Sequence, residues 1–278
     1  MKDKVVIITG ASSGIGKAMA FAFGHEGAKV VITGRKQAPL EETSKELSQV
    51  GIDNLAIVSD VSLEEDNIKV VEQTVAKYGR IDILINNAGI SMRSMFEDCD
   101  VDVIKKVMDI NFYGMVYATK YALPYIKKAK GSIVGISSIA GYRGLPVRIG
   151  YSASKFAMNG FLEALRTELL YEDVHVLTAC PGFTASNIRV ASLGGNGQTK
   201  GETMRDEGNM MSAEEVAAQI LKAVKNRKRE LILTTQGKLT VFLNKFLPSL
   251  TDKLTFNTLA KEKDSPLKKK NRIVLVKI

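Results

Sequence analysis

Two residues four positions apart, Tyr151 and Lys155, have side chains that could carry out acid–base chemistry. They belong to a helical pattern that continues through Phe161, Leu165 and Leu169, and a spacing of four places both on one helix face. A tyrosine is ordinarily too weak an acid to exchange protons at neutral pH. An adjacent ammonium stabilises the phenolate, so we expect Lys155 to lower the pKa of Tyr151 and make it a proton donor and acceptor.

A serine hydroxyl is expected to join this pair. Ser138 lies 13 residues before Tyr151, just past an apolar run, and a loop there could aim its hydroxyl at the same carbonyl oxygen. Ser137 is the alternative, and the spacing favours Ser138. A serine hydrolase is not indicated, because no suitable histidine accompanies Ser138. An isolated Tyr-x-x-x-Lys is usually a surface pair, but here a Gly-rich turn, an Asn-Asn-Ala-Gly loop and a Ser-Ser pair precede it in order.

The Gly-rich turn follows the run Val5-Val6-Ile7-Ile8 and opens a helical pattern. Its glycines let the backbone turn tightly and approach a pyrophosphate, which then meets the N–H groups and positive dipole end of the helix. A Gly-rich turn without a ligand is the alternative, but its position after the first strand favours a dinucleotide site. The predicted binding residues are Gly10, Ser12, Ser13, Gly14, Ile15 and Gly16.

The end of the second apolar run indicates which dinucleotide binds. NAD sites usually carry an acidic residue there for the ribose 2′-hydroxyl. Here the run ends in Gly34-Arg35-Lys36, with no acid. A carboxylate would repel a 2′-phosphate, whereas Arg35 can bind it, so we predict NADP(H). The alternative is that both bases are solvated. Asp60, after the third run, is placed to contact the adenine amino group, and Val61 is included in the cofactor site.

Short apolar runs alternate with helical patterns along the chain, which predicts βαβ units and a parallel sheet. We expect an α/β fold with one Rossmann-type, doubly wound, seven-stranded parallel sheet and helices on both faces. Residues 1–235 would form one domain with the active site, and residues 236–278 a C-terminal helical extension. The expected strands are Val5–Ile8, Val30–Thr33, Leu55–Val58, Ile81–Ile85, Ser132–Ile136, Val174–Ala179 and Glu230–Leu233, and the expected helices include Pro39–Gln49, Leu63–Tyr78 and Val101–Lys127.

Over residues 3 to 235 the sequence resembles a classical short-chain dehydrogenase/reductase. The matching residues are Thr9-Gly10-x-x-x-Gly14-x-Gly16, Asn86-Asn87-Ala88-Gly89, Asn111, Ser138, Tyr151, Lys155 and Pro181-Gly182. The resemblance implies that Ser138 orients the substrate carbonyl and that Tyr151 is the acid/base. Lys155 would also bind the nicotinamide ribose, and Asn111 would hold a water that links Lys155 to solvent. It implies further that Asn87, Ala88 and Gly89 line the cofactor, and that Pro181, Gly182, Phe183 and Thr184 lie near the carboxamide. Ser186 stands where many members have threonine.

Residues 151–169 are similar to the branch that contains 11-beta-hydroxysteroid dehydrogenases, their dehydrogenase/reductase relatives and 3-ketosphinganine reductases. That branch implies a bulky apolar, steroid- or lipid-like ketone or alcohol as substrate, and often membrane proximity, although the sequence has no N-terminal anchor. The alternatives are a small polar ketone or sugar as substrate, and a non-catalytic NADP-binding scaffold. The family implies a homodimer or homotetramer through helices around Asn111–Lys127 and Tyr151–Leu170. Residues that could line an apolar pocket are Met92, Met95, Phe96, Tyr142, Leu145, Phe183 and Met210-Met211.

Composition limits the class of protein. With 45% hydrophobic and 25% charged residues among 278, the chain is globular. Two cysteines exclude a disulfide scaffold and suggest a reducing compartment, and two histidines argue against a histidine-built metal site. The absence of a spanning apolar run and of a signal peptide predicts a cytoplasmic protein, soluble or peripheral on a membrane surface.

The positive charge is concentrated near the C-terminus. The net charge is +9, yet residues 221–278 carry 15 basic and 4 acidic side chains, so nucleic-acid binding by the main body is not expected. Lys238 to Leu259 shows an apolar stripe that Pro248 divides into two helical pieces. The basic cluster Lys268-Lys269-Lys270-x-Arg272 and the apolar run Ile273–Val276 follow. The stripe either packs on the domain or a second subunit, or lies in a lipid interface with the bases against anionic headgroups.

Overall fold

A computed structural model describes residues 1–182, 184, 188, 191–199, 201, 210–262 and 264–268. Its centre is a parallel sheet with the strand order β3-β2-β1-β4-β5-β6-β7. Each predicted strand is confirmed to within two residues at either end. The strands are β1 (Val5–Ile8), β2 (Lys29–Gly34), β3 (Asn54–Val58), β4 (Ile83–Asn86), β5 (Ser132–Ile136), β6 (His175–Cys180) and β7 (Glu230–Ile232).

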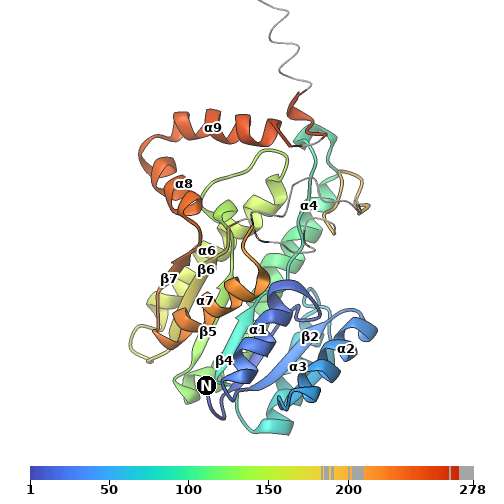
Figure 1. The fold of residues 1–278 in the computed structure, drawn as a ribbon, viewed down its shortest axis with the longest axis vertical. Coiled ribbons are helices and arrows are strands. Elements are labelled where there is room, and N and C mark those ends of the chain that lie inside the picture. Colours follow the sequence, from blue (N-terminus) through green and yellow to red (C-terminus); the bar gives the residue numbers. More distant parts are fainter. Residues whose placement is uncertain are drawn as a thin grey trace, which may run out of the picture.

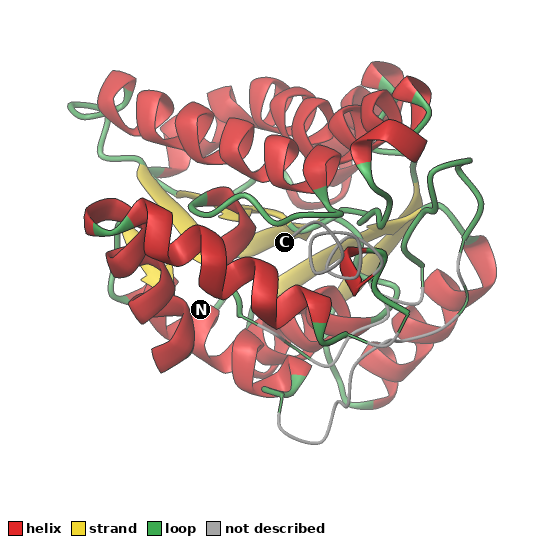
Figure 2. Ribbon diagram, turned by 90° about the horizontal axis from the view of Figure 1, so that it is seen from above, coloured by secondary structure: helices red, strands yellow, loops and turns green. Residues whose placement is uncertain are grey.

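Helices cover both faces of the sheet, so the doubly wound fold is confirmed, and the sheet runs between two helical layers in Figure 2. One layer consists of α1 (Gly14–His25), α2 (Gln37–Gln49) and α7 (Ala213–Lys225). The other consists of α3 (Glu64–Tyr78), α5 (Gly114–Ala129) and α6 (Ile149–Glu168). The remaining helical segments are α4 (Val101–Met108), α8 (Thr235–Phe246), α9 (Pro248–Ala260) and the short turns η1 (Phe96–Asp98), η2 (Asp109–Tyr113) and η3 (Ile139–Gly141).

The strands are predominantly apolar because both faces of the sheet are covered. In β1, Val6 and Ile8 pack into the α1 layer, whereas Val5 and Ile7 pack into the α3 layer. All four side chains are buried. Polar or charged residues in such a strand would lose their water without gaining partners. The polar and chemically active residues are therefore left to the strand ends.

Two helical segments differ from expectation. The single long helix expected over residues 101–127 is divided into α4 and α5 by the π-helical turn η2, which inserts one extra residue per turn and rotates Asn111 inward. The helix α7 was not predicted. Its N-terminus carries a capping box, in which Ser212 accepts from the backbone N–H of Glu215 and Glu215 accepts from that of Ser212. This Ser-x-x-Glu pattern could have revealed the helix.

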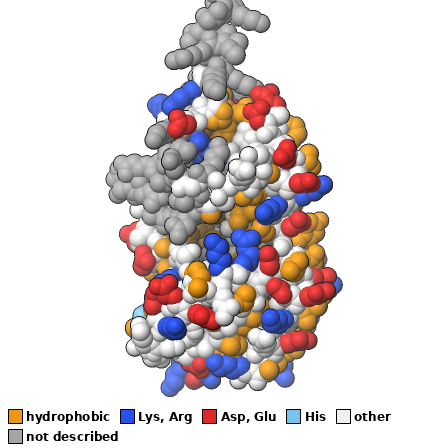
Figure 3. Space-filling view, turned by 90° about the vertical axis from the view of Figure 1, so that its right-hand side faces the viewer, with side chains coloured by type: hydrophobic (Ala, Val, Ile, Leu, Met, Phe, Trp, Pro, Cys, Tyr) orange, Lys and Arg blue, Asp and Glu red, His pale blue; other side chains and the backbone are white. Residues whose placement is uncertain are grey.

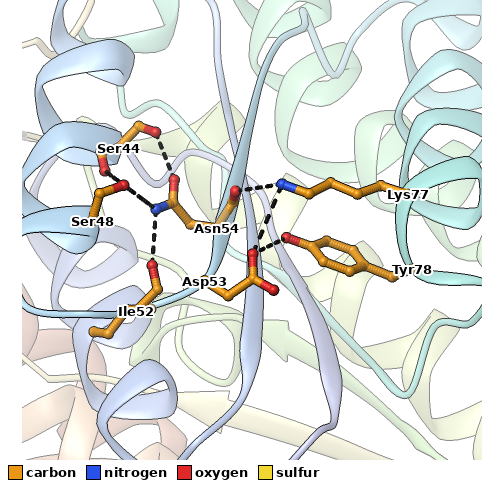
Figure 4. Close-up of polar contacts among 7 residues, drawn as sticks. All are labelled: Ser44, Ser48, Ile52, Asp53, Asn54, Lys77 and Tyr78. Carbon is orange, nitrogen blue, oxygen red and sulfur yellow. Dashed lines mark hydrogen bonds and ion pairs between the residues drawn. The ribbon is translucent and has the colours of Figure 1, made fainter.

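At the start of β3, a polar cluster links α2 and α3 to the sheet (Figure 4). The Asn54 side chain accepts a hydrogen bond from the Ser44 hydroxyl at 2.6 Å, while the Asn54 carbonyl accepts one from Lys77 at 2.9 Å. The Tyr78 hydroxyl donates to Asp53, and burial with this bond raises the pKa of Tyr78 well above its ordinary value. These contacts fix two helices at the amino ends of the strands and leave the carboxyl ends open.

Beyond the sheet, α8 and α9 lie together at one end of the molecule (Figure 1). The division of the stripe at Pro248 is confirmed, since α9 begins there. In the expected basic cluster, Lys269, Lys270 and Arg272 lie outside the described residues, as does the run Ile273–Val276.

Acidic and basic side chains alternate over the face drawn in Figure 3 instead of gathering by sign. On that face, the residues that the structure describes therefore form no extended basic surface of the kind that nucleic acids require. Among the helices formed by the described residues, none combines the length and apolar character needed to cross a bilayer.

The carboxylate of Asp82 joins the amino ends of β1 and β4. It is 1% exposed and accepts hydrogen bonds from the Val5 N–H at 3.0 Å, from Lys4 at 2.9 Å and from Arg80 at 2.6 and 2.8 Å. Burial by itself would raise the pKa of Asp82, but these bonds, led by those from Arg80, outweigh it and hold the pKa below its ordinary value. Asp82 therefore stabilises the fold above pH ~4, and this contribution is lost as the pH falls through the lowered pKa.

We predict that Asp82→Asn lowers the free energy of unfolding at pH 7 by about 1–3 kcal/mol, because it removes a buried charged acceptor. Urea unfolding at several pH values measures this, and the loss of stability below pH ~4 should be shallower in the variant than in the wild type. Asp102→Asn is the control, since Asp102 is 88% exposed in its pair with Lys105 and its loss should cost about 0.5 kcal/mol or less. An Asp82→Asn protein with unchanged stability and an unchanged acid slope would contradict the assignment.

Candidate active site

A cavity of about 370 Å³ lies at the carboxyl ends of the strands. Of the predicted catalytic residues, Ser138, Tyr151 and Lys155 line it. The predicted catalytic residue Asn111 and the predicted cofactor residue Asp60 do not line the cavity. Phe183 and Ser186 lie outside the described residues. The predicted cofactor residues that line the cavity are Gly10, Ser12, Ser13, Gly14, Ile15, Gly16, Arg35, Val61, Asn87, Ala88, Gly89, Pro181, Gly182 and Thr184.

The floor of the cavity is backbone, because there is no room for side chains at two of its glycines. Gly10 has φ +65°, and a Cβ there would lie 2.8 Å from the Cα of Ala88. A Cβ on Gly16 would lie 2.3 Å from the Gly10 carbonyl oxygen. The Asn87 side chain holds the turn by donating to the carbonyls of Thr9 at 2.9 Å and Gly10 at 3.0 Å. At the start of α1, Ser13 makes no side-chain cap, so the cavity faces N–H groups suited to a pyrophosphate.

The charged side chains of this cavity are all basic. Among the described residues, its lining contains Arg35, Arg148 and Lys155 and no carboxylate. Arg35 is exposed just after β2 and has no hydrogen bond or ion pair with another described residue. The lining therefore fits an anionic dinucleotide, and one cation is free at the end of β2.

Asp60 makes a local turn with Ser62. Its carboxylate accepts hydrogen bonds from the backbone N–H of Ser62 at 3.0 Å and from the Ser62 hydroxyl at 2.7 Å. This local Asx-type turn directs the side chain along its own backbone. The next residue, Val61, lines the cavity, whereas Asp60 does not. Both bonds end on the same oxygen, Oδ1, so the contact of Asp60 with an adenine stays a prediction.

Tyr151 and Ser138 meet at the cavity wall. The Ser138 hydroxyl accepts a hydrogen bond from the Ala140 N–H at 3.2 Å, and its interaction with the Tyr151 phenol favours a lower pKa of Tyr151. Ser137 is buried and donates to the carbonyl of Lys155 at 3.4 Å, so Ser138 is the serine that reaches the phenol. The Lys155 ammonium donates to the carbonyl of Ile136 at 2.8 Å and lies 5.7 Å from the centre of the Tyr151 ring.

Burial governs the protonation of this pair. It raises the pKa of Tyr151, and the interaction with Ser138 and the charge of Arg148 oppose it only in part. Burial also lowers the pKa of Lys155 to about 8. The expected lowering of the Tyr151 pKa by Lys155 is therefore not what this structure shows, because the cost of burying a phenolate is larger. At neutral pH Tyr151 is a phenol, ready to donate its proton.

Asn111 supports the site from behind. Its side chain accepts from the Ile90 N–H at 2.8 Å and donates to the Ile90 carbonyl at 3.0 Å. It also donates to the Ser154 hydroxyl at 2.9 Å, which in turn donates to the Tyr151 carbonyl at 2.8 Å. Asn111 thus joins the segment after β4 to the helix that carries Tyr151 and Lys155.

The substrate end of the cavity was predicted less well. Of the apolar residues proposed from the sequence, Leu145 lines it, whereas Met92 is buried in a separate core cluster and Phe96 is 65% exposed. Arg148 was missed, although its position one turn before Tyr151 could have drawn attention to it. Other apolar lining residues that sequence reasoning missed are Ile90, Ile110, Ile136, Ile188 and Ala191.

Known proteins share both the sequence and the fold. The short chain dehydrogenase family matches residues 4–194. The rat protein dehydrogenase/reductase SDR family member 7B is 36% identical over 273 residues, covering 95% of this chain and 84% of that protein. The 11-beta-hydroxysteroid dehydrogenase A of Sesamum indicum is 41% identical over 187 residues, covering 66% of this chain and 53% of that protein.

Among solved structures, a short chain dehydrogenase/reductase from Burkholderia phymatum in complex with NAD has the same fold. Its TM-score is 0.81, it is 22% identical, and the match covers 90% of this chain and 95% of that one. The family match covers most of the chain, and the relatives include both the 7B and the 11-beta-hydroxysteroid dehydrogenase proteins. The chain belongs to the short-chain dehydrogenase/reductase family, in the branch of these relatives.

Proposed function

We propose that the protein is an NADP(H)-dependent oxidoreductase that interconverts a carbonyl and a secondary alcohol, and that it reduces a bulky apolar ketone. The observation that carries this proposal is that the Tyr151 phenol and Ser138 lie together on the wall of a cavity whose floor is the Gly-rich turn. A protonated phenol beside a hydroxyl can hold a carbonyl oxygen and give it a proton.

Each residue has a distinct task in the proposed reaction. Ser138 orients the carbonyl oxygen, and Tyr151 donates its proton to that oxygen as the alcohol forms. Lys155 binds the nicotinamide ribose, and Asn111 holds a water that links Lys155 to solvent. When bound, the nicotinamide supplies the hydride to the carbonyl carbon. The reverse oxidation uses the same groups, with Tyr151 as the base.

The choice of NADP(H) over NAD(H) is supported by the end of β2. The free guanidinium of Arg35 stands there without an acidic neighbour, and a 2′-phosphate would pair with it. The solved relative in complex with NAD has the same fold at 22% identity, which leaves the residue after β2 as the better guide.

The substrate class is supported by the apolar lining and by the relatives named for 11-beta-hydroxysteroids. Leu145, Ile90 and Ile110 would contact the hydrocarbon part of a steroid- or lipid-like ketone. A panel of steroidal ketones, 3-keto lipids, small polar ketones and ketoses, with NADPH oxidation as the readout, separates this proposal from an enzyme acting on a small polar substrate. We also propose a homodimer or homotetramer through α5 and α6, on whose outer surfaces Tyr125 and Phe156 are exposed.

A peripheral membrane contact through the C-terminal extension is supported by a patch of exposed apolar residues. We define the apolar patch as Leu239, Phe242, Phe246, Leu247, Leu250 and Leu254, each between 46% and 60% exposed. Exposed lysines, among them Lys238, Lys245 and Lys253, lie in the same two helices. Apolar side chains beside lysines suit a lipid interface with anionic headgroups. The alternative that the whole stripe packs on its own domain is disfavoured by this exposure.

The proton donor can be tested first. Tyr151→Phe should lower the turnover of the best ketone in the panel by about 10²-fold or more, because no other group donates the proton. NADPH binding, followed by cofactor fluorescence, should change little. Near-normal turnover in Tyr151→Phe would refute the mechanism, and a wild-type protein that binds NADPH but reduces no ketone would favour the non-catalytic scaffold.

Cofactor selectivity gives a second prediction. Arg35→Ala should weaken NADPH binding by about 1.5 to 3 kcal/mol, the scale of a lost hydrogen bond between charged groups, and leave NADH binding nearly unchanged. Titration by cofactor fluorescence measures both. Lys36→Ala is the matched control, since Lys36 is the adjacent exposed base and does not line the cavity. Equal losses for the two cofactors, or a wild type that prefers NADH, would show that Arg35 does not bind the 2′-phosphate.

Membrane contact gives a third prediction, measured by sedimentation with anionic phosphatidylserine and neutral phosphatidylcholine liposomes at low and high salt. The wild type should sediment with anionic liposomes at low salt. Each lysine near the membrane surface should contribute roughly 1 kcal/mol to the free energy of binding. Phe242→Ser combined with Leu250→Ser should weaken binding at least about tenfold, because less apolar surface is buried. Leu170→Ser combined with Tyr171→Ser is the control, since both residues are exposed outside the patch. Wild-type protein that ignores anionic liposomes would leave subunit packing as the role of the patch.

A further inference from the structure

A buried ionic cluster lies next to the active-site cavity and takes no part in the reaction proposed above. Its centre is the Glu262 carboxylate, which is 2% exposed. Glu262 accepts two hydrogen bonds from Arg148, at 3.0 and 3.2 Å, and pairs with Arg93 at 3.5 Å. Because water is largely excluded, the attraction between these charges is much stronger than in a surface pair.

The cluster joins three segments that are far apart in the sequence. Arg93 follows β4, Arg148 directly precedes α6, and Glu262 follows α9. Apolar contacts surround it, because Leu259 and Leu267 from the C-terminal region pack against Val147. In Figure 1, α9 accordingly lies across the end of the molecule, over the segments that lead into α4 and α6.

The segment held by this cluster is strained. Val147 has φ +61°, in the left-handed region that a β-branched residue rarely adopts. Its carbonyl accepts a hydrogen bond from the Ser94 N–H at 2.9 Å, and its side chain is buried against Leu259 and Leu267. A strained backbone of this kind persists only where its surroundings hold it in place. Here the surroundings are supplied largely by the C-terminal region.

The strained residue Val147 lies four residues before the proposed acid/base, Tyr151. Arg148 is the last residue before α6 and lies one turn from Tyr151, and both line the cavity. The Arg148 carbonyl accepts from the Ser152 N–H at 2.9 Å, while the Ser152 hydroxyl accepts from the Leu145 N–H at 3.0 Å. The Arg148 guanidinium also acts on Tyr151 directly, since its positive charge favours the phenolate and opposes the effect of burial on the pKa.

We propose that Leu259, Glu262 and Leu267 form a C-terminal clamp, in which Glu262 is a positioning residue that holds Arg148 and thereby fixes the first turn of α6 with Tyr151. The reaction that this positioning serves is the one proposed above. The clamp makes the extension after β7 part of the active-site architecture. Without the Glu262 carboxylate, the guanidiniums of Arg93 and Arg148 would repel each other, and the strained segment at Val147 would lose the contact that keeps Arg148 beside the cavity.

Hydrogen exchange measured by mass spectrometry on the full chain tests the clamp without any substrate. Glu262→Gln should speed amide exchange in peptides covering residues 142–155 by about tenfold or more, since local opening becomes easier. Asp252→Asn is the matched control, because Asp252 lies in α9 and pairs with an arginine of the same segment, Arg143, but is 65% exposed. Glu262→Asp keeps the charge and should restore part of the protection, and it replaces Glu262→Gln if that variant fails to fold.

Kinetics then test whether the clamp positions Tyr151. Glu262→Gln should lower kcat/KM for the ketone about tenfold or more, while the Kd for NADPH changes by a smaller factor, because the Gly-rich turn and Arg35, which would hold the phosphates, are not part of the clamp. In the alcohol-oxidation direction Tyr151 must lose its proton, and the groups facing it are Ser138 after β5, Lys155 from α6, Cys180 from β6 and Arg148. The charge of Arg148 lowers the pKa of Tyr151, so displacing Arg148 should move the pH–rate profile to higher pH by about 0.5 pH units or more.

The possible outcomes are distinct. Unchanged exchange in residues 142–155 of Glu262→Gln overturns the clamp, whatever the turnover. Faster exchange with unchanged kcat/KM and an unchanged pH profile overturns the positioning of Tyr151, because a merely structural role predicts that result. Faster exchange in a protein whose wild type reduces no ketone supports the clamp and refutes the proposed function.

Discussion

The contact between the turn after β1 and the turn after β4 is the constraint on which the cavity depends. The strand order reverses at this point, so two turns that start from neighbouring strands lead to opposite sides of the sheet. The Thr9 hydroxyl accepts hydrogen bonds from the N–H groups of Asn87 and Ala88, both at 3.0 Å. Because Gly10 has no side chain, the two backbones can touch, and the crevice between them keeps a floor of main-chain donors.

Burial then decides the charge of the groups above that floor. Tyr151 and Cys180 are both buried, and burial raises the pKa of the Cys180 thiol to about 12. Both groups therefore stay protonated and uncharged at neutral pH. Burial thus keeps the proposed acid protonated, while the charged side chains of the described lining, Arg35, Arg148 and Lys155, are all basic and suit an anionic cofactor.

Sequence patterns predicted those parts of the molecule that depend on neighbouring residues. Apolar runs marked the strands, and the motifs that the sequence analysis singled out bring Ser138, Tyr151 and Lys155 to one cavity. What was not predicted depends on contacts that the local sequence does not encode. The long helix expected over residues 101–127 is interrupted at the π-helical turn η2, which contains Asn111. Glu262 lies in a lysine-rich stretch whose composition predicts a solvated segment. It is buried because it pairs with Arg148, which lies 114 residues earlier in the chain.

The helix α9 shows why a stripe of apolar residues did not predict one buried face. Phe256 and Leu259 pack inward against the segments that border the cavity, whereas Leu250 and Leu254, nearer the start of the helix, are exposed. The apolar residues of α9 thus serve two surfaces, and the helix presents an apolar patch outward while its end supplies Leu259 and Glu262 to the clamp. In this fold, the proposed membrane contact and the positioning of Tyr151 depend on the same helix.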